Sequence, residues 1–189
     1  MEEEISITPQ RHRCAWVTNT PLDVHYHDTE WGRPSHCDTY LFEMLVLEGM
    51  QAGLSWLTVL KKREAYRHAF YHFNIEKVAC MTDDALHTCL LNPHLIRHPE
   101  KIASIRHNAR IVRNIQKEEG TLATYLWRFA PEKSSGGTHV SSTPESALFA
   151  HHLKKRGMAF VGPITMHAFM QAVGMRNDHE PGCFLYPRS

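Results

Sequence analysis

Apolar residues recur every three or four positions through most of the chain, whereas the apolar and polar alternation that predicts strands is almost absent. The clearest helical pattern begins at Pro99 and ends at Gly120. Proline suits the first turn of a helix and glycine suits its end. We therefore predict an all-α fold that contains a long amphipathic helix. The apolar face of this helix should consist of Ile102, Ile105, Ala109, Val112 and Ile115.

Cap and stop residues divide the rest of the chain into further helices. In the helix that Ser55 should cap, and just beyond it, four residues are spaced to share one face: Val59, Tyr66, Phe70 and Phe73. The expected helices are capped by Asp38 (through Met50), Ser55, Asn74 and Thr82, and others cover TLATYLWRFA up to Pro131, Thr143 to Gly157 and Pro163 to Gly174.

The length fits one well-packed domain, or one domain with a small appendage, and no repeat or low-complexity tract appears. We predict a single domain over residues 1–189. Its helical core should cover about 36–174, between irregular terminal segments at about 11–35 and 175–189. The polar stretch KSSGGTHVSST, residues 133–143, is the one clear loop, and it is too short to mark a domain boundary.

The start of the chain, MEEEISITPQRHR, matches neither a secretory signal nor a basic transit peptide, and we expect a cytoplasmic protein. The longest uncharged stretch is GMAFVGPITMHAFMQAVGM. It is interrupted by Gly162, Pro163, His167 and Gln171, which favours a buried helix over a membrane span. No role at a membrane is expected.

The composition, with 42% hydrophobic and 10% aromatic residues, is that of a folded globular protein. The formal net charge of +1 gives the whole molecule no strong attraction for nucleic acid. The charges are unevenly distributed, however. Basic residues gather between Arg97 and Arg113 and in two KKR triplets, at 61–63 and 154–156. Such runs most often form a solvated helix face, and a nucleic-acid surface is the alternative.

Two Cys and His pairs stand at opposite ends of the chain. Cys14 and His27 lie in the irregular first segment, and His179 and Cys183 lie in NDHEPGCF near the end. The H-x3-C spacing suits a tetrahedral zinc ion, and the four side chains would complete a structural site. A metal would also stabilise two segments that are poor in apolar residues. With 15 histidines and five cysteines, chance spacing is the alternative.

The odd number of cysteines, without a secretory context, argues against a disulfide framework. Cys37, Cys80 and Cys89 lie in or beside apolar helical patterns, so we interpret them as core thiols. No H-E-x-x-H motif occurs, which disfavours a hydrolytic zinc ion.

Three of the four tryptophans fall in the first third of the chain. The stretch CAWVTNTPLDVHYHDTEWG contains Trp16, Tyr26 and Trp31, and Trp56 follows soon after. Their irregular spacing does not define one helix face. These rings are therefore either core residues or the walls of a flat pocket.

Glu48 interrupts an otherwise apolar helix pattern in LFEMLVLEGMQAGLSW. A glutamate at a helix end usually has its carboxylate in water. The alternative is a half-buried carboxylate among aromatic faces, which would suit a flat cation: the rings attract it and the carboxylate accepts hydrogen bonds from its edge. Gly49 and Gly53 would let the backbone turn sharply and approach a ligand.

Five strings together resemble the bacterial 3-methyladenine DNA glycosylase I family, in the family's order and from Cys14 to Cys183. They are CAWVTNTPLDVHYHDTEWG, LFEMLVLEGMQAGLSWLTVLKKREAY, LIRHPEKI, LKKRGMAFVGP and NDHEPGC. The resemblance implies a single glycosylase domain with the helix-hairpin-helix fold. It also implies a monomeric base-excision repair enzyme that flips 3-methyladenine out of alkylated double-stranded DNA and hydrolyses its N-glycosidic bond. The products would be an abasic site and free 3-methyladenine.

The same resemblance implies roles for individual residues. A structural zinc ion, one per chain, would tie the termini through Cys14, His27, His179 and Cys183. The base pocket would be formed by Glu48, Trp16, Tyr26 and Trp56, with Trp31 as a further lining residue. The QAGLSW loop is similar to one that enters the gap left by the flipped nucleotide, so the DNA-binding candidates are Gln51, Gly53 and Leu54, together with Arg97 and Lys101 near the hairpin.

Glu48 is the candidate catalytic residue, primarily through recognition of the base. Relatives in the wider superfamily use an aspartate after the hairpin, whereas the helix after Pro99 offers only Glu118 and Glu119 at its far end. Whether Glu48 also orients water is open on the sequence.

The chain departs from the family pattern at the hairpin NPHLIRHPEKI. His94 and Glu100 stand where family members generally carry glycine, and Pro99 stands where they carry arginine. Such hairpins hold DNA through backbone N–H groups directed at phosphate, so we predict weaker anchoring than in the family. Arg97, Lys101 and the KKR triplets could compensate. Asp23 stands where family members often carry a pocket tyrosine. We expect this difference to alter the pocket wall and, through it, the range of substrates.

Two other functions are compatible with the residues. One is a non-catalytic binder of alkylated DNA or free methylated purine, which the hairpin departures make conceivable. The other is a zinc-dependent hydrolase, which would lose activity on chelation while its fold stayed intact.

Overall fold

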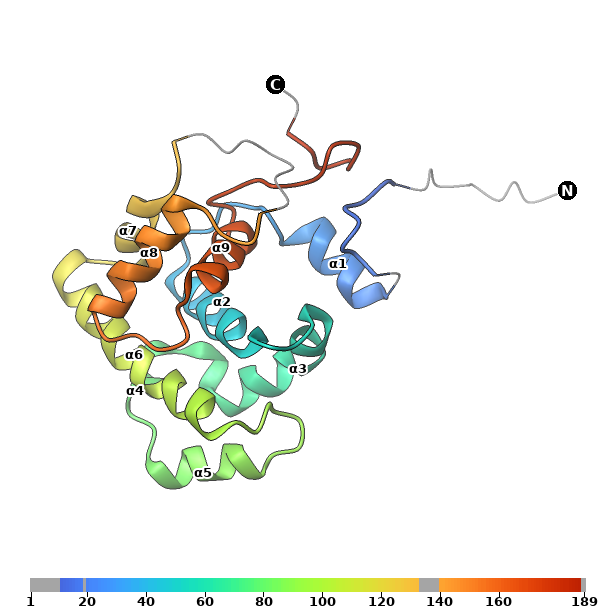
Figure 1. Ribbon diagram of the computed structural model, residues 1–189. Helices are drawn as coiled ribbons and strands as arrows, with labels where there is room; N and C mark the ends of the chain where they lie inside the picture. Colours follow the sequence, from blue (N-terminus) through green and yellow to red (C-terminus); the bar gives the residue numbers. More distant parts are fainter. Residues whose placement is uncertain (1–10, 19, 133–139, 188–189) are drawn as a thin grey trace, which may run out of the picture.

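The computed structural model describes residues 11–18, 20–132 and 140–187, and within them the regular secondary structure is entirely helical (Figure 1). The leading residues MEEEISITPQ lie outside the described residues. Of the expected loop at 133–143, only residues 140–143 are described. The α-helices are α1 (Pro21–Thr29), α2 (Asp38–Gln51), α3 (Trp56–Ala69), α4 (Ile75–Ala79), α5 (Asp83–Leu91), α6 (Pro99–Glu119), α7 (Leu122–Leu126), α8 (Pro144–Lys155) and α9 (Pro163–Ala172), with short 3-10 turns at Tyr71–Phe73 and Trp127–Phe129.

Most of the predicted helix boundaries are confirmed. The side chains of Ser55, Asn74, Thr82 and Thr143 each accept a backbone N–H from the first turn of the helix that follows. Gly120 ends α6 with a φ of 85°, a conformation that glycine adopts without steric cost. The five predicted apolar residues of α6 are all buried.

Asp38 does not cap α2 as predicted. Cys37 is the N-cap residue and makes no side-chain cap bond, while Asp38 is the first residue of the helix itself. The carboxylate of Asp38 instead accepts the backbone N–H groups of Leu122 and Ala123, at 2.8 and 2.9 Å, and an N–H of Gln116 at 2.6 Å. It therefore caps α7, a helix more than 80 residues further along the chain.

The first terminal segment is less irregular than expected, because residues 21–29 form α1. Thr20 caps this helix, since its hydroxyl accepts the N–H of Asp23, and Pro21 occupies the first helical position. His27 therefore lies on a helix rather than in an irregular segment. The segments before α1 and after α9 meet, since the backbone N–H of Phe184 donates to the carbonyl of His12 at 3.0 Å. Figure 1 shows both segments on the same side of the molecule.

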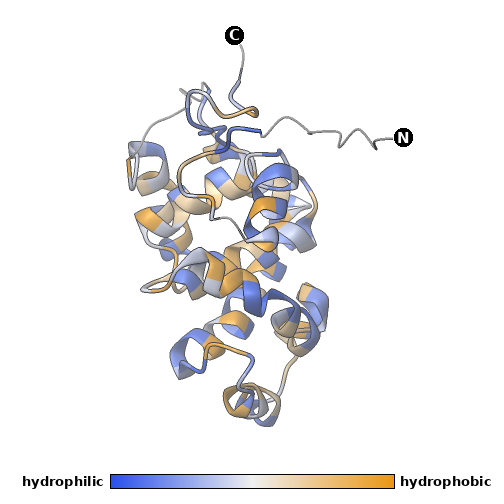
Figure 2. Cartoon of the chain, turned by 90° about the vertical axis from the view of Figure 1, so that its right-hand side faces the viewer, coloured by the Kyte–Doolittle hydropathy of each residue, from blue (hydrophilic) through white to orange (hydrophobic). Residues whose placement is uncertain are grey.

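α2 lies at the centre of the molecule. Every residue from Leu41 to Met50 is buried, and the helix packs against α3, α6, α7 and α9. A helix that is buried all round belongs in the core. Figure 2 shows hydrophobic and hydrophilic residues interleaved along the helices, as expected where helices pack around a common core. Among the described residues, no helix is both long and apolar enough to cross a bilayer.

The prediction of three core thiols is wrong for two of them. Cys37 and Cys80 are exposed, whereas Cys89 is buried. Cys37 precedes the first turn of α2 and Cys80 follows the last turn of α4. At both places the residue stands at a helix end rather than on a packed face.

Candidate functional site

A cavity of about 330 Å³ opens between α1, the C-terminal half of α2, the start of α3 and α9. All five residues predicted to form a base pocket line it, although they come from separate parts of the chain. The lining residues are Trp16, Tyr26, Trp31, Glu48, Gln51, Trp56, Val140, Ala168, Gln171, Asp178 and Glu180.

The aromatic rings meet mostly at their edges rather than in parallel stacks. The ring centroids of Tyr26 and Trp56 lie 5.1 Å apart with the planes tilted by 48°, and those of Trp16 and Trp31 lie 5.0 Å apart with the planes at 66°. Tyr26 is only 2% exposed, whereas Trp16 is 36% exposed. The rings therefore serve as the walls of a cavity with Trp16 nearer its mouth, rather than as core residues alone.

Glu48 reaches the cavity from the buried helix α2, and its side chain is only 4% exposed. This burial raises the pKa of its carboxyl group from 4.5 to about 8, because removal from water disfavours the charged form. Its Oε2 atom has no hydrogen-bond partner among the described residues. The carboxyl group is therefore buried with one oxygen unpaired, rather than solvated at a helix end.

Two further polar atoms around the cavity share this condition. The hydroxyl of Tyr26 and the indole Nε1 of Trp56 are buried and make no hydrogen bond to a described residue. Leaving such a group unpaired costs about 1–3 kcal/mol, so proteins rarely bury several together without a ligand. With Glu48, they give an aromatic cavity two donors or acceptors and one carboxyl group that a ligand could satisfy.

The two glycines near Glu48 have different roles. Gly53 has a φ of 81°, so it makes the sharp turn that was predicted. Gly49 lies inside α2, and a Cβ atom there would stand 3.3 Å from the Cβ of Phe160. The prediction of a turn at Gly49 is therefore wrong, since this glycine permits close packing of α2 against Phe160.

Residues 51–54 form a type II turn between α2 and α3. Ala52 has φ −46° and ψ 112°, Gly53 follows with its positive φ, and the N–H of Leu54 donates to the carbonyl of Gln51. Gln51 lines the cavity, and Leu54 is 41% exposed. The turn thus carries one residue that lines the cavity and one apolar side chain that is exposed to solvent.

The two cations predicted to contact DNA near the hairpin differ in their surroundings. Arg97 is exposed in the connection between α5 and α6. Lys101 is only 6% exposed, and its ammonium group donates to the carbonyls of Met50 and Ala52. Its ammonium is therefore engaged by protein carbonyls and is not presented to a phosphate in this structure.

Most of the other cations in the basic runs are also paired within the protein. Arg106 donates to the carboxylate of Asp83, and Arg113 donates to that of Glu76. Arg63, in the first KKR triplet, is buried. The interpretation as a solvated helix face is thus wrong at Arg63, whereas the pairs made by Arg106 and Arg113 lie at the surface.

Asp23 does not line the cavity. It is 2% exposed, and its Oδ2 atom accepts the backbone N–H of Thr18 at 2.8 Å. The carboxylate fixes the chain that enters α1, so its expected effect on the pocket wall is not direct.

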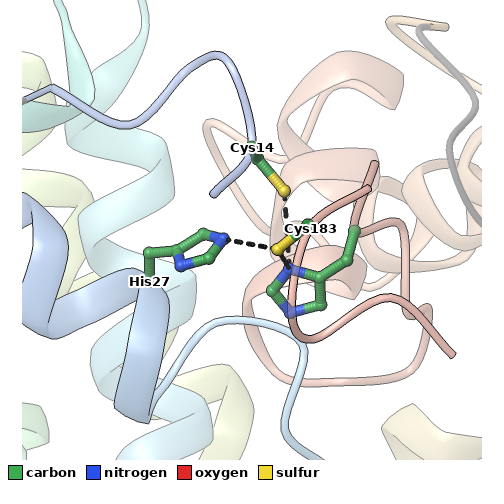
Figure 3. Close-up of side chains that lie close together, drawn as sticks. Cys14, His27 and Cys183 are labelled. Carbon is green, nitrogen blue, oxygen red and sulfur yellow. Dashed lines mark hydrogen bonds between the residues drawn. The ribbon is translucent and has the colours of Figure 1, made fainter. Parts of the chain in front are cut away.

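The four Cys and His residues from the two ends of the chain come together as predicted. The candidate ligand atoms of Cys14, His27, His179 and Cys183 are all buried and lie within 4.8 Å of one another. The Sγ of Cys183 is 3.5 Å from Nε2 of His27 and 3.6 Å from Nδ1 of His179 (Figure 3). A tetrahedral ion with bonds of about 2.0–2.3 Å requires ligand separations of about 3.3–3.8 Å, so the cluster can hold a metal ion.

Contacts around the cluster also suit a metal site. Nδ1 of His27 lies 2.8 Å from the carboxylate of Asp28, which is the usual way to orient a ligating imidazole. The guanidinium of Arg13 binds the same carboxylate and, with His27, lowers the pKa of Asp28 to about 2. The Sγ of Cys14 accepts the backbone N–H of Glu180. Both the ligands and their supports are therefore in place.

Sequence reasoning missed three polar residues of the cavity wall, namely Gln171, Asp178 and Glu180. Gln171 donates to the carboxylate of Asp178 at 3.0 Å, and Arg176 donates to the same carboxylate. The sequence did contain a signal for Gln171, because it is a polar residue within the mostly apolar stretch that includes α9. Unlike Glu48, Asp178 is compensated by neighbouring donors.

The described part of the chain is helical in its regular structure, and its aromatic cavity can receive a flat ring with polar atoms at its edge. A family model described as methyladenine glycosylase matches residues 16–186. The chain therefore belongs to the methyladenine glycosylase family. Among its relatives, DNA-3-methyladenine glycosylase 1 of Escherichia coli (strain K12) is 42% identical over 181 residues, which are 93% of this chain and 97% of that protein.

Solved structures agree with this assignment. A crystal structure of a 3-methyladenine DNA glycosylase I matches with a TM-score of 0.89 at 43% identity, over 93% of this chain and 100% of that one. The Staphylococcus aureus 3-methyladenine DNA glycosylase I, described in terms of its recognition of 3-methyladenine, matches with a TM-score of 0.88 at 34% identity, over 94% and 97% of the two chains.

Proposed function

We propose that this protein removes 3-methyladenine from alkylated double-stranded DNA by base flipping and hydrolysis of the N-glycosidic bond. The observation that carries the proposal is the set of three buried, unpaired polar atoms around one aromatic cavity, on Tyr26, Glu48 and Trp56. Membership of the methyladenine glycosylase family supports it independently.

The chemistry of the lesion matches these residues. Methylation at N3 makes the adenine ring cationic, so the base can leave as a neutral molecule without a strong general acid. The faces of Trp56 and Tyr26 attract a cationic ring. The carboxyl group of Glu48 becomes a carboxylate more readily when a cation lies beside it, since the nearby charge opposes the effect of burial. Normal adenine carries no such charge and gains less from the pocket.

Extrusion of the nucleotide supplies a second level of selection. Flipping costs a few kcal/mol, and it costs less for a damaged base that pairs and stacks poorly. Leu54, which is exposed on the turn at 51–54, would fill the gap that the flipped nucleotide leaves. The connection between α5 and α6 would act as the hairpin that holds the phosphates, with Arg97 as its exposed cation.

Zinc is the metal best suited to the Cys2His2 cluster, and its role would be structural. The four protein ligands would fill a tetrahedral shell and would leave no open position for a reacting water. When bound, the ion ties the segment before α1 to the segment after α9. It thereby fixes Trp16 and Trp31, which stand beside the ligands on the chain. One chain supplies the whole pocket, so a monomer with a single glycosylase domain suffices.

The direct test is the release of free methylated base from alkylated duplex DNA by the purified protein. Glu48→Gln should lower release by at least about 100-fold, since hydrogen-bond readout to a buried group discriminates strongly. Trp56→Ala should weaken it as well. Binding of alkylated DNA without release would identify the alternative, a non-catalytic binder, and would refute the enzyme.

A further inference from the structure

Lys101 occupies an unusual place for a lysine. It lies in the first turn of α6, where the positive end of the helix dipole disfavours a cation. It is nevertheless buried, and its Nζ donates to the carbonyl of Met50 at 3.0 Å and to that of Ala52 at 2.8 Å. Contacts with residues outside α6 must therefore offset the free-energy cost of burying a cation at the positive end of this helix.

Those two carbonyls belong to the end of α2 and to the turn that follows it. The last carbonyls of a helix lack intrahelical partners, and a cation placed near them also complements the negative end of the dipole. Met50 lies in the last turn of α2, and Ala52 is the second residue of the turn at 51–54. The ammonium thus fixes the backbone on both sides of Gln51.

The same region is held from a third side by the segment that precedes α9. The ring centroid of Phe160 lies 6.0 Å from Nζ of Lys101, and Gly49 lets α2 pack closely against Phe160. Asn108 of α6 bonds both the N–H and the carbonyl of Ala159, each at 3.0 Å. The end of α2, the start of α6 and residues 159–160 are therefore joined into one packed unit.

We propose that Lys101 is a positioning residue for base extrusion. Its two hydrogen bonds hold the turn at 51–54, and with it Leu54, at a fixed place relative to the α5–α6 connection that opens α6. This role rests on the proposed function. Once phosphates are held at the connection, the fixed turn keeps Leu54 in the gap in the duplex, and the extruded base cannot easily return to the stack.

The test separates positioning from phosphate binding with Lys101→Met, which keeps the aliphatic stem and removes the donors. Lys117→Met is the matched control, since Lys117 is an exposed lysine in the last turn of the same helix. Arg97→Met is the reference for a phosphate ligand. Three quantities are measured: excision of the methylated base opposite thymine and opposite an abasic site, the salt dependence of DNA binding, and binding of free 3-methyladenine.

For Lys101→Met we expect excision opposite thymine to fall at least about tenfold, with a much smaller loss opposite the abasic site, where extrusion costs less. The salt slope and the binding of free base should stay as in the wild type, and Lys117→Met should change nothing. Arg97→Met should reduce the salt slope by about 0.9 if it neutralises one phosphate. In a Leu54→Ala background the effect of Lys101→Met should shrink, since both act through the turn.

Several results would overturn the role of Lys101. A reduced salt slope with equal losses on both substrates would make it a phosphate ligand, and loss of free-base binding would make it a general support of the pocket. Unchanged excision would remove any role. If Lys101→Met does not fold, Lys101→Gln, which removes the ammonium and shortens the side chain, must show the same difference between the substrates. Absence of base release by the wild type would instead refute the proposed function itself.

Discussion

The Nη1 atom of Arg63 in α3 donates to both carboxylate oxygens of Glu30, at 2.9 and 2.8 Å, immediately beyond the end of α1. The Nε atom of the same guanidinium donates to Glu43 in α2. One side chain therefore ties together the three helices that carry Tyr26, Glu48 and Trp56. The guanidinium is well suited to this, because it presents several donors in a rigid plane.

Replacing Arg63 with methionine should destabilise the protein by about 3–5 kcal/mol, because Glu43 would be left buried with less compensation. Urea unfolding measures this loss. Arg67→Met is the control, since Arg67 also donates to Glu43 but is more exposed, and it should cost less. Adding Glu43→Gln to Arg63→Met should recover part of the stability. If the double variant is no more stable than Arg63→Met alone, the explanation by an unpaired charge is wrong.

The raised pKa of Glu48 makes a distinct prediction about pH. Below about pH 4.5 the carboxyl group is protonated in both the folded and the unfolded states, so it costs no stability. As the pH rises from 4.5 to about 8, the unfolded chain releases this proton and the folded chain keeps it, so stability falls. Above about pH 8 the loss is complete, on the order of 5 kcal/mol at about 1.36 kcal/mol per pKa unit.

Glu48→Gln removes this titration, so the variant should gain stability relative to the wild type between pH 5 and pH 9. The measurement is urea unfolding of both proteins at several pH values. The same variant should lose base release, so a group that destabilises the fold would be retained for recognition. A stability difference that does not vary with pH would contradict the raised pKa.

Removal of metal should unfold the terminal segments and abolish activity together. A chelator is expected to lower the melting temperature and base release in parallel, and added Zn²⁺ should restore both, because the proposed ion would tie the segment before α1 to the segment after α9. Cys183→Ala should behave like the chelated wild type. Loss of activity with an unchanged melting temperature would instead indicate a catalytic metal.

Helix positions followed from local signals, whereas long-range partners did not. Ser55 and Thr82 cap the helices that directly follow them, which a sequence reveals because cap and helix are neighbours. Asp38 is a residue type that often caps the helix following it, yet its carboxylate caps α7, because the fold brings the start of that helix within reach. The same holds for Lys101. Its charge and its place near the hairpin suggested a contact with phosphate, whereas the fold brings its ammonium to the carbonyls of Met50 and Ala52.

The candidate site was accessible from sequence to the extent that its residues were chemically unusual. Glu48 stood out because a carboxylate interrupts an apolar helix, and the Cys and His pairs stood out by spacing. Gln171 and Asp178 were harder to find, since their place on the cavity wall depends on how α9 and the last segment pack on α2. Periodicity within one helix carries no information about that packing.

The hairpin departures predict weaker anchoring on DNA than in relatives with glycine at positions 94 and 100 and arginine at 99. Pro99 offers no N–H, and the exposed Glu100 would place a negative charge beside any phosphate held at this connection. The triple change His94→Gly, Pro99→Arg and Glu100→Gly should therefore tighten binding and steepen its salt dependence, by about 0.9 for a new arginine on one phosphate.

This gain should come at a cost to the protein itself. Pro99 suits the first position of α6. An acidic residue in the first turn, here Glu100, stabilises the helix by about 0.3–1 kcal/mol through its interaction with the helix dipole. The triple variant should thus melt at a lower temperature while it binds DNA more tightly. Salt titrations of the variant and the wild type on the same duplex measure the first effect, and thermal unfolding measures the second. Equal affinities and equal slopes would show that these three residues do not limit anchoring, and that phosphate contacts are made elsewhere on the surface.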